Sequence, residues 1–299
     1  MKSAYIFPGQ GSQYIGMDSI FKEDQAAVNK YFDISNSILG YDIYKIIKEG
    51  PADKLNSTQY TQPAIFIISA IANHIYTDKY GIPDCCAGHS LGEITALYSS
   101  NVLEFEESLH LIQKRAESMD STGKLNPGGM IALIKATDDQ VNLILKETSL
   151  SIANINSPKQ IILSGKIKAI ENSIKLCKEN KIKALKLPVS GAFHSSLMFN
   201  ASEALLKTIN DLNFKDAIMP IYQNYSALPT QDKDLIKNNL IKQITSPVLW
   251  EQTINNMIND KVSSFIEIGP KKVLTGINRT INKNLTYNSF EDLIENESV

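Results

Sequence analysis

The sequence predicts an α/β protein: a parallel sheet covered by helices, with a smaller unit of different organisation inserted in the middle of the chain. In the first third, short apolar strands at residues 3–7 and 85–87 are separated by a long apolar helix at 62–80, an alternation typical of parallel sheets. In the middle third the elements follow the order strand, helix, strand, strand, helix, strand, which is typical of ferredoxin-like units.

The remaining elements of the larger unit follow in chain order. A loop at 9–13 comes after the first strand, and a helix begins near Ser90 after the second. Further on we expect helix 105–119, helix 195–212, strand 220–223, helices 233–243 and 249–259, and strand 263–268. In such a sheet, the loops at the carboxyl ends of the strands form the site.

The inserted unit lies between two turn-rich segments. It begins after 121–129 and ends before Ser190, so we predict a small ferredoxin-like unit at 124–189 and a large unit formed by 1–123 and 190–299. The expected elements of the small unit are strand 130–135, helix 138–147, strands 151–155 and 160–164, helix 167–180 and strand 182–189.

Composition excludes several classes of partner. The 299 residues include 30 Lys plus Arg and 32 Asp plus Glu, a formal net charge of −2, so no overall field attracts nucleic acid or an acidic lipid surface. The longest uncharged run, 56–77, is strongly apolar only over 64–72, which indicates a buried helix and no membrane span. The three cysteines, Cys85, Cys86 and Cys177, lack metal-ligand spacing, and the apolar N-terminal stretch is too short for a signal peptide. We therefore expect a cytoplasmic protein with no metal, nucleic-acid or membrane partner.

The segment Gly88-His89-Ser90-Leu91-Gly92 carries the strongest chemical signal. It follows a short apolar strand and precedes a helix, which is the setting of a nucleophile elbow. Glycines are needed at both ends because side chains there would collide with neighbouring backbone. The turn places the Ser90 hydroxyl at a helix N-terminus, where the Leu91 N–H can stabilise an oxyanion. The alternative is that Ser90 only caps the helix.

A serine nucleophile needs a base, and the chain has four histidines. His74 and His110 lie inside amphipathic helices, where surface or core positions explain them. His89 adjoins Ser90, so its side chain should point away from the hydroxyl. His194 remains, in a loop between strand and helix, and we predict that it is the base. The alternative is a loop or helix-capping histidine.

Several further segments occur in a characteristic order along nearly the whole chain. Together with the elbow they are 7–13 (FPGQGSQ), 61–64 (TQPA), 88–93 (GHSLGE), 114–115 (KR), 154–158 (NINSP), 191–195 (GAFHS), 243–250 (QITSPVLW) and 267–270 (EIGP). This set resembles the malonyl-CoA:acyl carrier protein transacylases and the related acyltransferase domains of polyketide synthases. The resemblance implies an α/β-hydrolase-like core with an inserted ferredoxin-like subdomain, in agreement with the element order.

The resemblance also implies a Ser/His dyad and its surroundings. The backbone carbonyl of Gln243 would orient His194, and the N–H groups of Gln10 and Leu91 would form the oxyanion hole. Between the dyad residues, six acids lie on expected turns or polar helix faces, and none of them stands out as a third catalytic group: Asp120, Asp138, Asp139, Glu147, Glu171 and Glu179.

Substrate-binding candidates come from the same resemblance. Arg115 would hold the free carboxylate of a malonyl group, for which a planar guanidinium is suited; otherwise Lys114-Arg115 is a solvated helix face. Phe193 and Leu91 resemble the malonyl pattern rather than the methylmalonyl one. The remaining candidates are Gln62, Asn154 and Asn156, with the two asparagines near the pantetheine path, although Asn-Ser-Pro is also an ordinary turn signal.

The resulting expectation is ping-pong transfer of a malonyl group from malonyl-CoA to the phosphopantetheine thiol of an acyl carrier protein. The CoA thioester is a substrate, and no cofactor is expected, since the third glycine of a dinucleotide loop would fall on Tyr14. We expect a discrete monomer acting in trans in fatty-acid or polyketide synthesis. The alternatives are an acyl hydrolase that edits carrier thioesters and a catalytically silent carrier-docking module.

Overall fold

Six strands form the central sheet of the computed structural model, which describes residues 2–21 and 25–297. The strands are β1 (Lys2–Phe7), β2 (Cys85–Gly88), β7 (Ile221–Tyr222), β8 (Pro229–Thr230), β9 (Val262–Glu267) and β10 (Thr286–Ser289). Their order is β10-β9-β1-β2-β7-β8, and all neighbours are parallel except the β7–β8 pair. The prediction of an α/β fold with a parallel sheet is confirmed, apart from the antiparallel edge strand.

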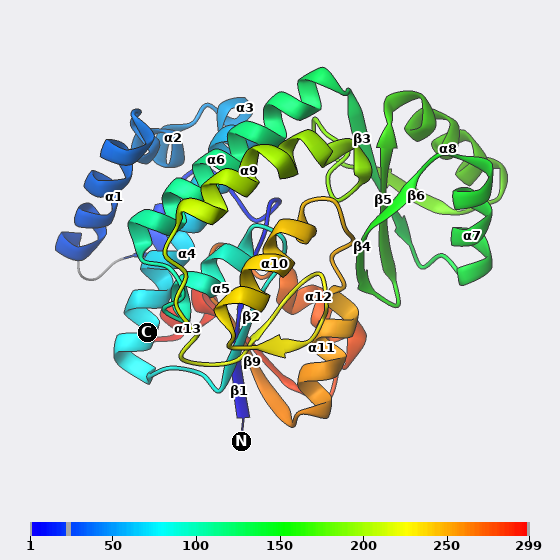
Figure 1. Cartoon of the computed structure of the whole chain (residues 1–299). Helices are drawn as coiled ribbons and strands as arrows, with labels where there is room; N and C mark the ends of the chain where they lie inside the picture. The colour runs from blue at the N-terminus through cyan, green and yellow to red at the C-terminus, as the bar shows by residue number, and fades with distance from the viewer. Residues whose placement is uncertain (1, 22–24, 298–299) are drawn as a thin grey trace.

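Strand β1 shows why this sheet needs helices on both faces. Its side chains alternate between two separate apolar clusters, with Tyr5 and Phe7 in one and Ala4 and Ile6 in the other, because successive residues of a strand point to opposite faces. Helices cover both faces (Figure 1): α1 (Gln25–Leu39), α2 (Ile43–Glu49), α3 (Ala52–Leu55), α4 (Thr58–Tyr80), α5 (Gly92–Ser99), α6 (Phe105–Leu125), α9 (Phe199–Asp211), α10 (Lys233–Gln243), α11 (Trp250–Asn259), α12 (Val273–Ile281) and α13 (Phe290–Glu297), with short 3-10 helices at Met17–Ile20 and Ser196–Met198.

Three helices differ from their expected bounds by more than two residues. One is α6, which continues to Leu125 instead of ending at 119. Helix α4 begins at Thr58, four residues before the expected start, with Pro63 inside it; a proline this close to the N-terminus removes only one early hydrogen bond. The expected helix 195–212 is broken into a 3-10 turn and α9, and the Ser195 side chain accepts from the Leu197 N–H at the start of that turn. In the part of the chain that the structure describes, no helix has the length and apolar character needed to cross a membrane.

A second, antiparallel sheet is formed by the middle of the chain and lies to the right in Figure 1. Its strands β3 (Gly128–Ile134), β4 (Ser151–Ser157), β5 (Gln160–Lys166) and β6 (Lys183–Lys186) pair in the order β4-β5-β3-β6. Helices α7 (Asp138–Glu147) and α8 (Ile167–Glu179) complete a separate core with the sheet, in which Ile131 and Leu133 meet Val141, Ile144 and Ile170.

The expected last strand of this unit, 182–189, is too long. Strand β6 covers only Lys183–Lys186. Leu187 still donates its N–H to the Met130 carbonyl of β3 at 2.9 Å, and the chain leaves the sheet after it. Leu187 and Val189 contact the main apolar cluster and line the pocket described below. The short strand thus directs two apolar side chains into the site.

A backbone contact joins strand β4 to the segment between α10 and α11. Residue Val248, just before α11, accepts a hydrogen bond from the Ile155 N–H at 2.9 Å and donates one to the Ala153 carbonyl at 2.9 Å. Asn154 forms a parallel bridge with the same residue. Strand β4 is thereby held against the large unit at the point where both contribute side chains to one cavity.

Candidate active site

Ser90 lies in a strained turn between β2 and α5. Its φ is 55°, a left-handed conformation that is costly for a residue with a side chain. A Cβ at Gly88 would lie 1.9 Å from the Gly92 carbonyl oxygen, and a Cβ at Gly92 would lie 2.2 Å from the Phe7 oxygen. Both positions therefore require glycine, as expected. The helix-cap alternative is wrong, since α5 begins at Gly92 and has no side-chain cap.

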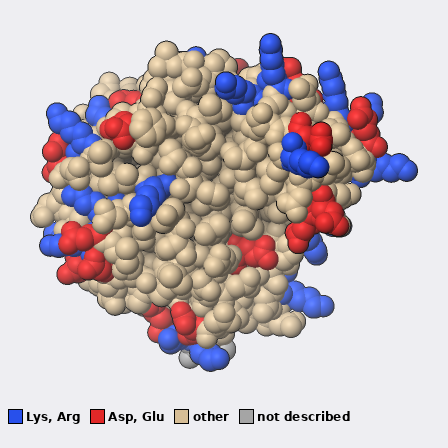
Figure 2. Space-filling view, turned by 45° about the vertical axis from the view of Figure 1, so that its right-hand side comes forward, with Lys and Arg blue, Asp and Glu red and all other residues tan. Residues whose placement is uncertain are grey.

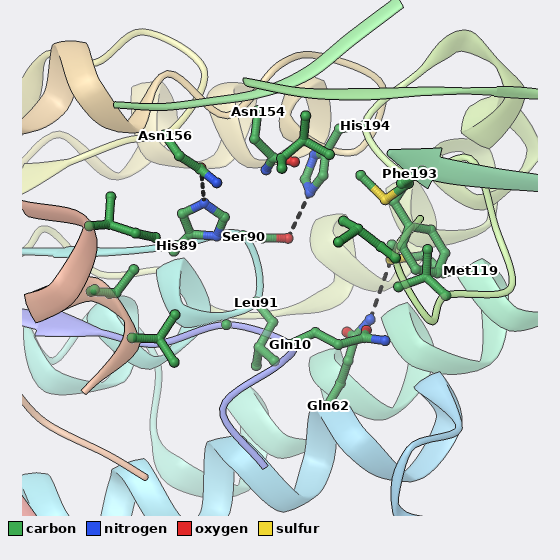
Figure 3. A pocket seen from close by; sticks show the side chains of 18 of the residues that line it. Gln10, Gln62, His89, Ser90, Leu91, Met119, Asn154, Asn156, Phe193 and His194 are labelled. Atoms are coloured by element: carbon green, nitrogen blue, oxygen red, sulfur yellow. Dashed lines mark hydrogen bonds between the residues drawn. The ribbon is translucent and has the colours of Figure 1, made fainter. Parts of the chain in front are cut away.

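His194 meets the hydroxyl directly. Its Nε2 lies 2.7 Å from Ser90 Oγ, and its Nδ1 lies 3.0 Å from the Gln243 carbonyl oxygen (Figure 3). The carbonyl can only accept, so Nδ1 carries the proton and Nε2 is free to accept from the serine. Burial, together with the nearby Arg115, lowers the pKa of His194 to about 3. The imidazole is therefore neutral near neutral pH, and its Nε2 lone pair is available to accept a proton.

The other histidines take no part in this contact. The His89 ring turns away from the Ser90 hydroxyl toward Asn156, whose Oδ1 lies 2.9 Å from Nε2, and packs edge-on against Trp250. His74 and His110 are exposed.

Arg115 is buried beside the nucleophile, with 2% of its surface exposed. Its Nη2 donates to Ser90 Oγ at 3.0 Å and to Gln243 Oε1 at 3.1 Å, while Nη1 donates to Gln62 Oε1 at 2.7 Å. The Nε hydrogen has no partner in the described chain. Burial lowers the pKa of Arg115 to about 10, which leaves the guanidinium charged. The alternative of a solvated helix face is wrong.

A cavity of about 270 Å³ opens over these groups. Met119, Met130 and Phe193 form part of its apolar lining. Asn154 and Asn156 of β4 line another part of it, and Figure 3 shows both asparagines on the side of Ser90 away from Gln62. The two units of the chain therefore share one pocket, with the serine hydroxyl within it.

Gln10 and Leu91, the expected oxyanion donors, both line this cavity. Figure 3 places them side by side below Ser90. Within the described residues, no hydrogen bond uses the backbone N–H of either one. Two free amides beside a nucleophile can bind a developing negative charge.

Two residues behind the elbow were not predicted. The Asn224 side chain accepts from the Ser90 N–H at 2.6 Å and donates to the Gly88 carbonyl at 2.6 Å. Glu93 is fully buried and accepts from the Asn224 N–H at 2.7 Å; burial raises the pKa of its carboxyl group. Two features of the sequence could have indicated these residues. Asn224 directly follows the strand expected at 220–223, and Glu93 directly follows the elbow motif.

Fold and site together fit one class of protein: an acyl transferase in which a serine hydroxyl meets a histidine that a backbone carbonyl holds. The family model described as acyl transferase domain matches residues 4–293, and the chain belongs to this family.

Individual relatives agree with the resemblance stated from the sequence, which is confirmed. A malonyl CoA-acyl carrier protein transacylase of Bacillus subtilis is 38% identical over 97% of this chain and 94% of its own length. That of Escherichia coli is 32% identical over 97% of this chain and 96% of its own. Among solved structures, the transacylase of Coxiella burnetii has a TM-score of 0.94 at 30% identity, covering 99% of this chain and 96% of its own. A type II polyketide acyl-carrier protein in complex with its malonyl-transacylase gives 0.93 at 30% identity, covering 99% and 100%.

Proposed function

We propose that this chain transfers a malonyl group from malonyl-CoA to the phosphopantetheine thiol of an acyl carrier protein, in fatty-acid or polyketide synthesis. The names of its relatives support the reaction. The observation that carries the proposal is the buried Arg115 guanidinium, 3.0 Å from Ser90 Oγ. A charged, partly unpaired guanidinium at the reacting hydroxyl suits an acyl group that carries its own carboxylate.

The first half-reaction loads the serine. His194 Nε2 takes the Ser90 proton as Oγ attacks the thioester carbonyl carbon, and the amides of Gln10 and Leu91 bind the oxyanion. When the tetrahedral intermediate collapses, the C–S bond breaks. The CoA sulfur leaves with the proton held by His194, and malonyl remains as an ester on Ser90.

The second half-reaction reverses these roles for a new thiol. His194 removes the proton of the carrier's pantetheine thiol, the sulfur attacks the ester carbonyl, and Ser90 Oγ leaves and regains a proton from His194. Gln62 fixes Nη1 of Arg115 toward the carboxylate, while Phe193 forms part of the apolar wall. Asn154 and Asn156 line the path of the pantetheine arm. Each proton transfer is assigned to a residue of this chain, so we propose no metal or other resident cofactor.

The same proposal covers the architecture. The strand order β4-β5-β3-β6 with α7 and α8 supports a ferredoxin-like subdomain at 124–189, inserted in an α/β-hydrolase-like unit formed by 1–123 and 190–299. We propose that the protein acts as a cytoplasmic monomer.

Intact-protein mass spectrometry tests the function. After mixing with malonyl-CoA, the wild-type chain should gain about 86 Da, the mass of one malonyl group in ester linkage, and Ser90→Ala should gain nothing. Added carrier protein should then remove the adduct and acquire it. Release of free malonate without carrier loading would indicate the editing hydrolase, and an unlabelled wild-type serine after fluorophosphonate treatment would indicate a silent docking module.

A further inference from the structure

The Asn224 side chain lies behind the elbow and bonds to both sides of His89. It is fully buried and follows β7, the neighbour of β2 in the sheet. Its amide accepts from the Ser90 N–H and donates to the Gly88 carbonyl, both at 2.6 Å. These two bonds constrain the two peptides that flank His89, the second of which leads into the strained Ser90.

The hydrogen bonds of the elbow show what this contact achieves. The His89 N–H donates to Phe7 and the Gly92 N–H donates to the His89 carbonyl. With the Ser90 N–H taken by Asn224, only the Leu91 N–H of this turn stays unpaired within the described chain. Asn224 thus leaves one amide for the oxyanion and holds it toward the cavity.

Glu93 holds Asn224 in turn. Its two carboxylate oxygens accept from the Asn224 N–H at 2.7 Å and from Gln223 Nε2 at 3.2 Å. Gln223 receives a further bond from Asn239 Nδ2 at 2.9 Å. A buried carboxylate with two donors has little freedom to move. Glu93 therefore holds the backbone of Asn224, which in turn limits the positions that the Asn224 side-chain amide can take.

We propose that Asn224, held by Glu93, is a positioning residue of the nucleophile elbow, on the N–H side of Ser90, while Gln243 Nε2 donates to the Ser90 carbonyl at 3.0 Å. Asn224 sets the Ser90 peptide so that Oγ meets His194 and the Leu91 N–H faces the oxyanion, without touching the substrate. The inference rests on the proposed acyl transfer. Because Asn224 does not line the cavity and is not among the hydrogen-bond partners of Arg115, its loss should lower kcat and leave KM nearly unchanged.

The first test compares two buried asparagines. Asn224→Ala should reduce kcat for malonyl transfer by roughly 10- to 100-fold, as small misplacements of reacting groups do, with KM within about threefold. Asn239→Ala removes an amide from the same network but none from the elbow, and should change both constants by less than about threefold. Equal losses in the two variants, or a change confined to KM, would overturn the proposal.

A second variant gives a readout that a purely structural role would not move. Asn224→Asp keeps an acceptor for the Ser90 N–H but has a hydrogen to donate to Gly88 only when protonated. Burial beside Glu93 should raise the pKa of the new carboxyl group, with the Arg115 charge opposing and His89 and His194 neutral. The kcat of this variant should therefore rise as pH falls from 8 to 6, relative to the wild type. A pH profile parallel to that of the wild type would refute the positioning role of Asn224. This test still holds if Asn224→Ala does not fold.

Fluorophosphonate labelling separates this inference from the function. Phosphonylation needs Ser90, His194 and the elbow but no malonyl group. If the wild type is labelled normally but takes up no malonyl group, the proposed function fails. The positioning role of Asn224 can then still be tested by comparing labelling rates. If Asn224→Ala is labelled as fast as the wild type, the positioning role of Asn224 is refuted and the transferase proposal stands.

Discussion

Arg115 carries a permanent charge in a buried pocket with an unpaired Nε hydrogen, so at the scale of single residues it should determine the choice of acyl group. Replacing Arg115 by alanine leaves the malonyl carboxylate without its partner, a loss on the order of 2–5 kcal/mol. We expect kcat/KM for malonyl-CoA to fall at least about 30-fold, while that for acetyl-CoA stays unchanged or rises.

The decisive quantity is the ratio of the two values, measured with one carrier protein. An unchanged ratio would mean that Arg115 does not recognise the carboxylate. Lys114→Ala is the matched control, since this neighbour on α6 is half exposed and forms an ion pair with Glu117.

A second prediction at this scale concerns pH. His194 is buried, and its pKa is lowered to about 3, so its neutral, basic form persists well below the ordinary value of 6.5. Acyl-enzyme formation should therefore keep its rate from pH 8 to about pH 5. Stopped-flow release of CoA can follow this step. A decline centred near 6.5 would show that the imidazole titrates as if exposed.

The same shift has a consequence for stability. Between about pH 3 and pH 6.5 the unfolded chain binds a proton at His194 that the folded chain does not, so folding stability decreases as pH falls through this window.

At the scale of elements, the turn between β2 and α5 depends on contact between backbones. A Cβ at Gly88 would lie 1.9 Å from backbone atoms of Gly92, which cannot move without displacing α5. Gly88→Ala should therefore abolish fluorophosphonate labelling of Ser90 and lower the thermal midpoint.

Gly276→Ala is the control for this prediction. Gly276 lies in α12, and a Cβ there meets nothing within 4 Å. This variant should keep full labelling and gain roughly 0.5–1 kcal/mol of stability from the helix propensity of alanine. Normal labelling in Gly88→Ala would contradict the prediction, because it would show that the turn can adopt another backbone conformation that still exposes Ser90.

Local signals were enough to predict several elements. Helix 138–147 matches α7 to the residue because Thr137 and Gln140 form a capping box at its start. The end of strand 182–189 could not be located, since Leu187 and Val189 continue its apolar pattern while packing on another unit. Strand periodicity does not reveal which core a side chain joins.

The site, too, could be predicted only where a local motif marks it. Ser90 and its glycines stand in one short motif, and the structure brings His194 to it. The meeting of Arg115 with Gln62 and the Gln243 side chain depends on three helices, α4, α6 and α10, packing together. No local pattern states such a contact. The contact of Asn224 with Ser90 could not be predicted for the same reason, since the two residues are 134 positions apart in the sequence.

At the scale of the whole molecule, charge is unevenly distributed. Residues 124–189 contain eleven lysines and five acidic residues, whereas the rest of the chain has a net charge of −8. Lysine side chains project from this part in the right-hand region of Figure 2, and the centre of that view is largely uncharged. Since β4 and β5 line the cavity, a carrier that delivers its thiol there must approach this basic unit.

Salt dependence should report that approach. With a carrier of net negative charge, raising NaCl from 0.05 to 0.5 M should lower kcat/KM for the acceptor at least about tenfold, because screening weakens steering. Free pantetheine, which has no charge, should change by less than about threefold under the same conditions. Equal salt effects on the two acceptors would exclude electrostatic docking of the carrier.

The two ends of segment 124–189, which we propose as the small unit, are adjacent: a Cβ at Gly123 would lie 3.0 Å from the Ser190 oxygen. A segment with neighbouring ends can be exchanged between related genes by recombination without moving the rest of the fold. Such an exchange would replace Asn154, Asn156 and Met130 while keeping Ser90, His194 and Arg115. Evolution could in this way alter which donor arm or carrier is accepted while inheriting the bond-making chemistry intact.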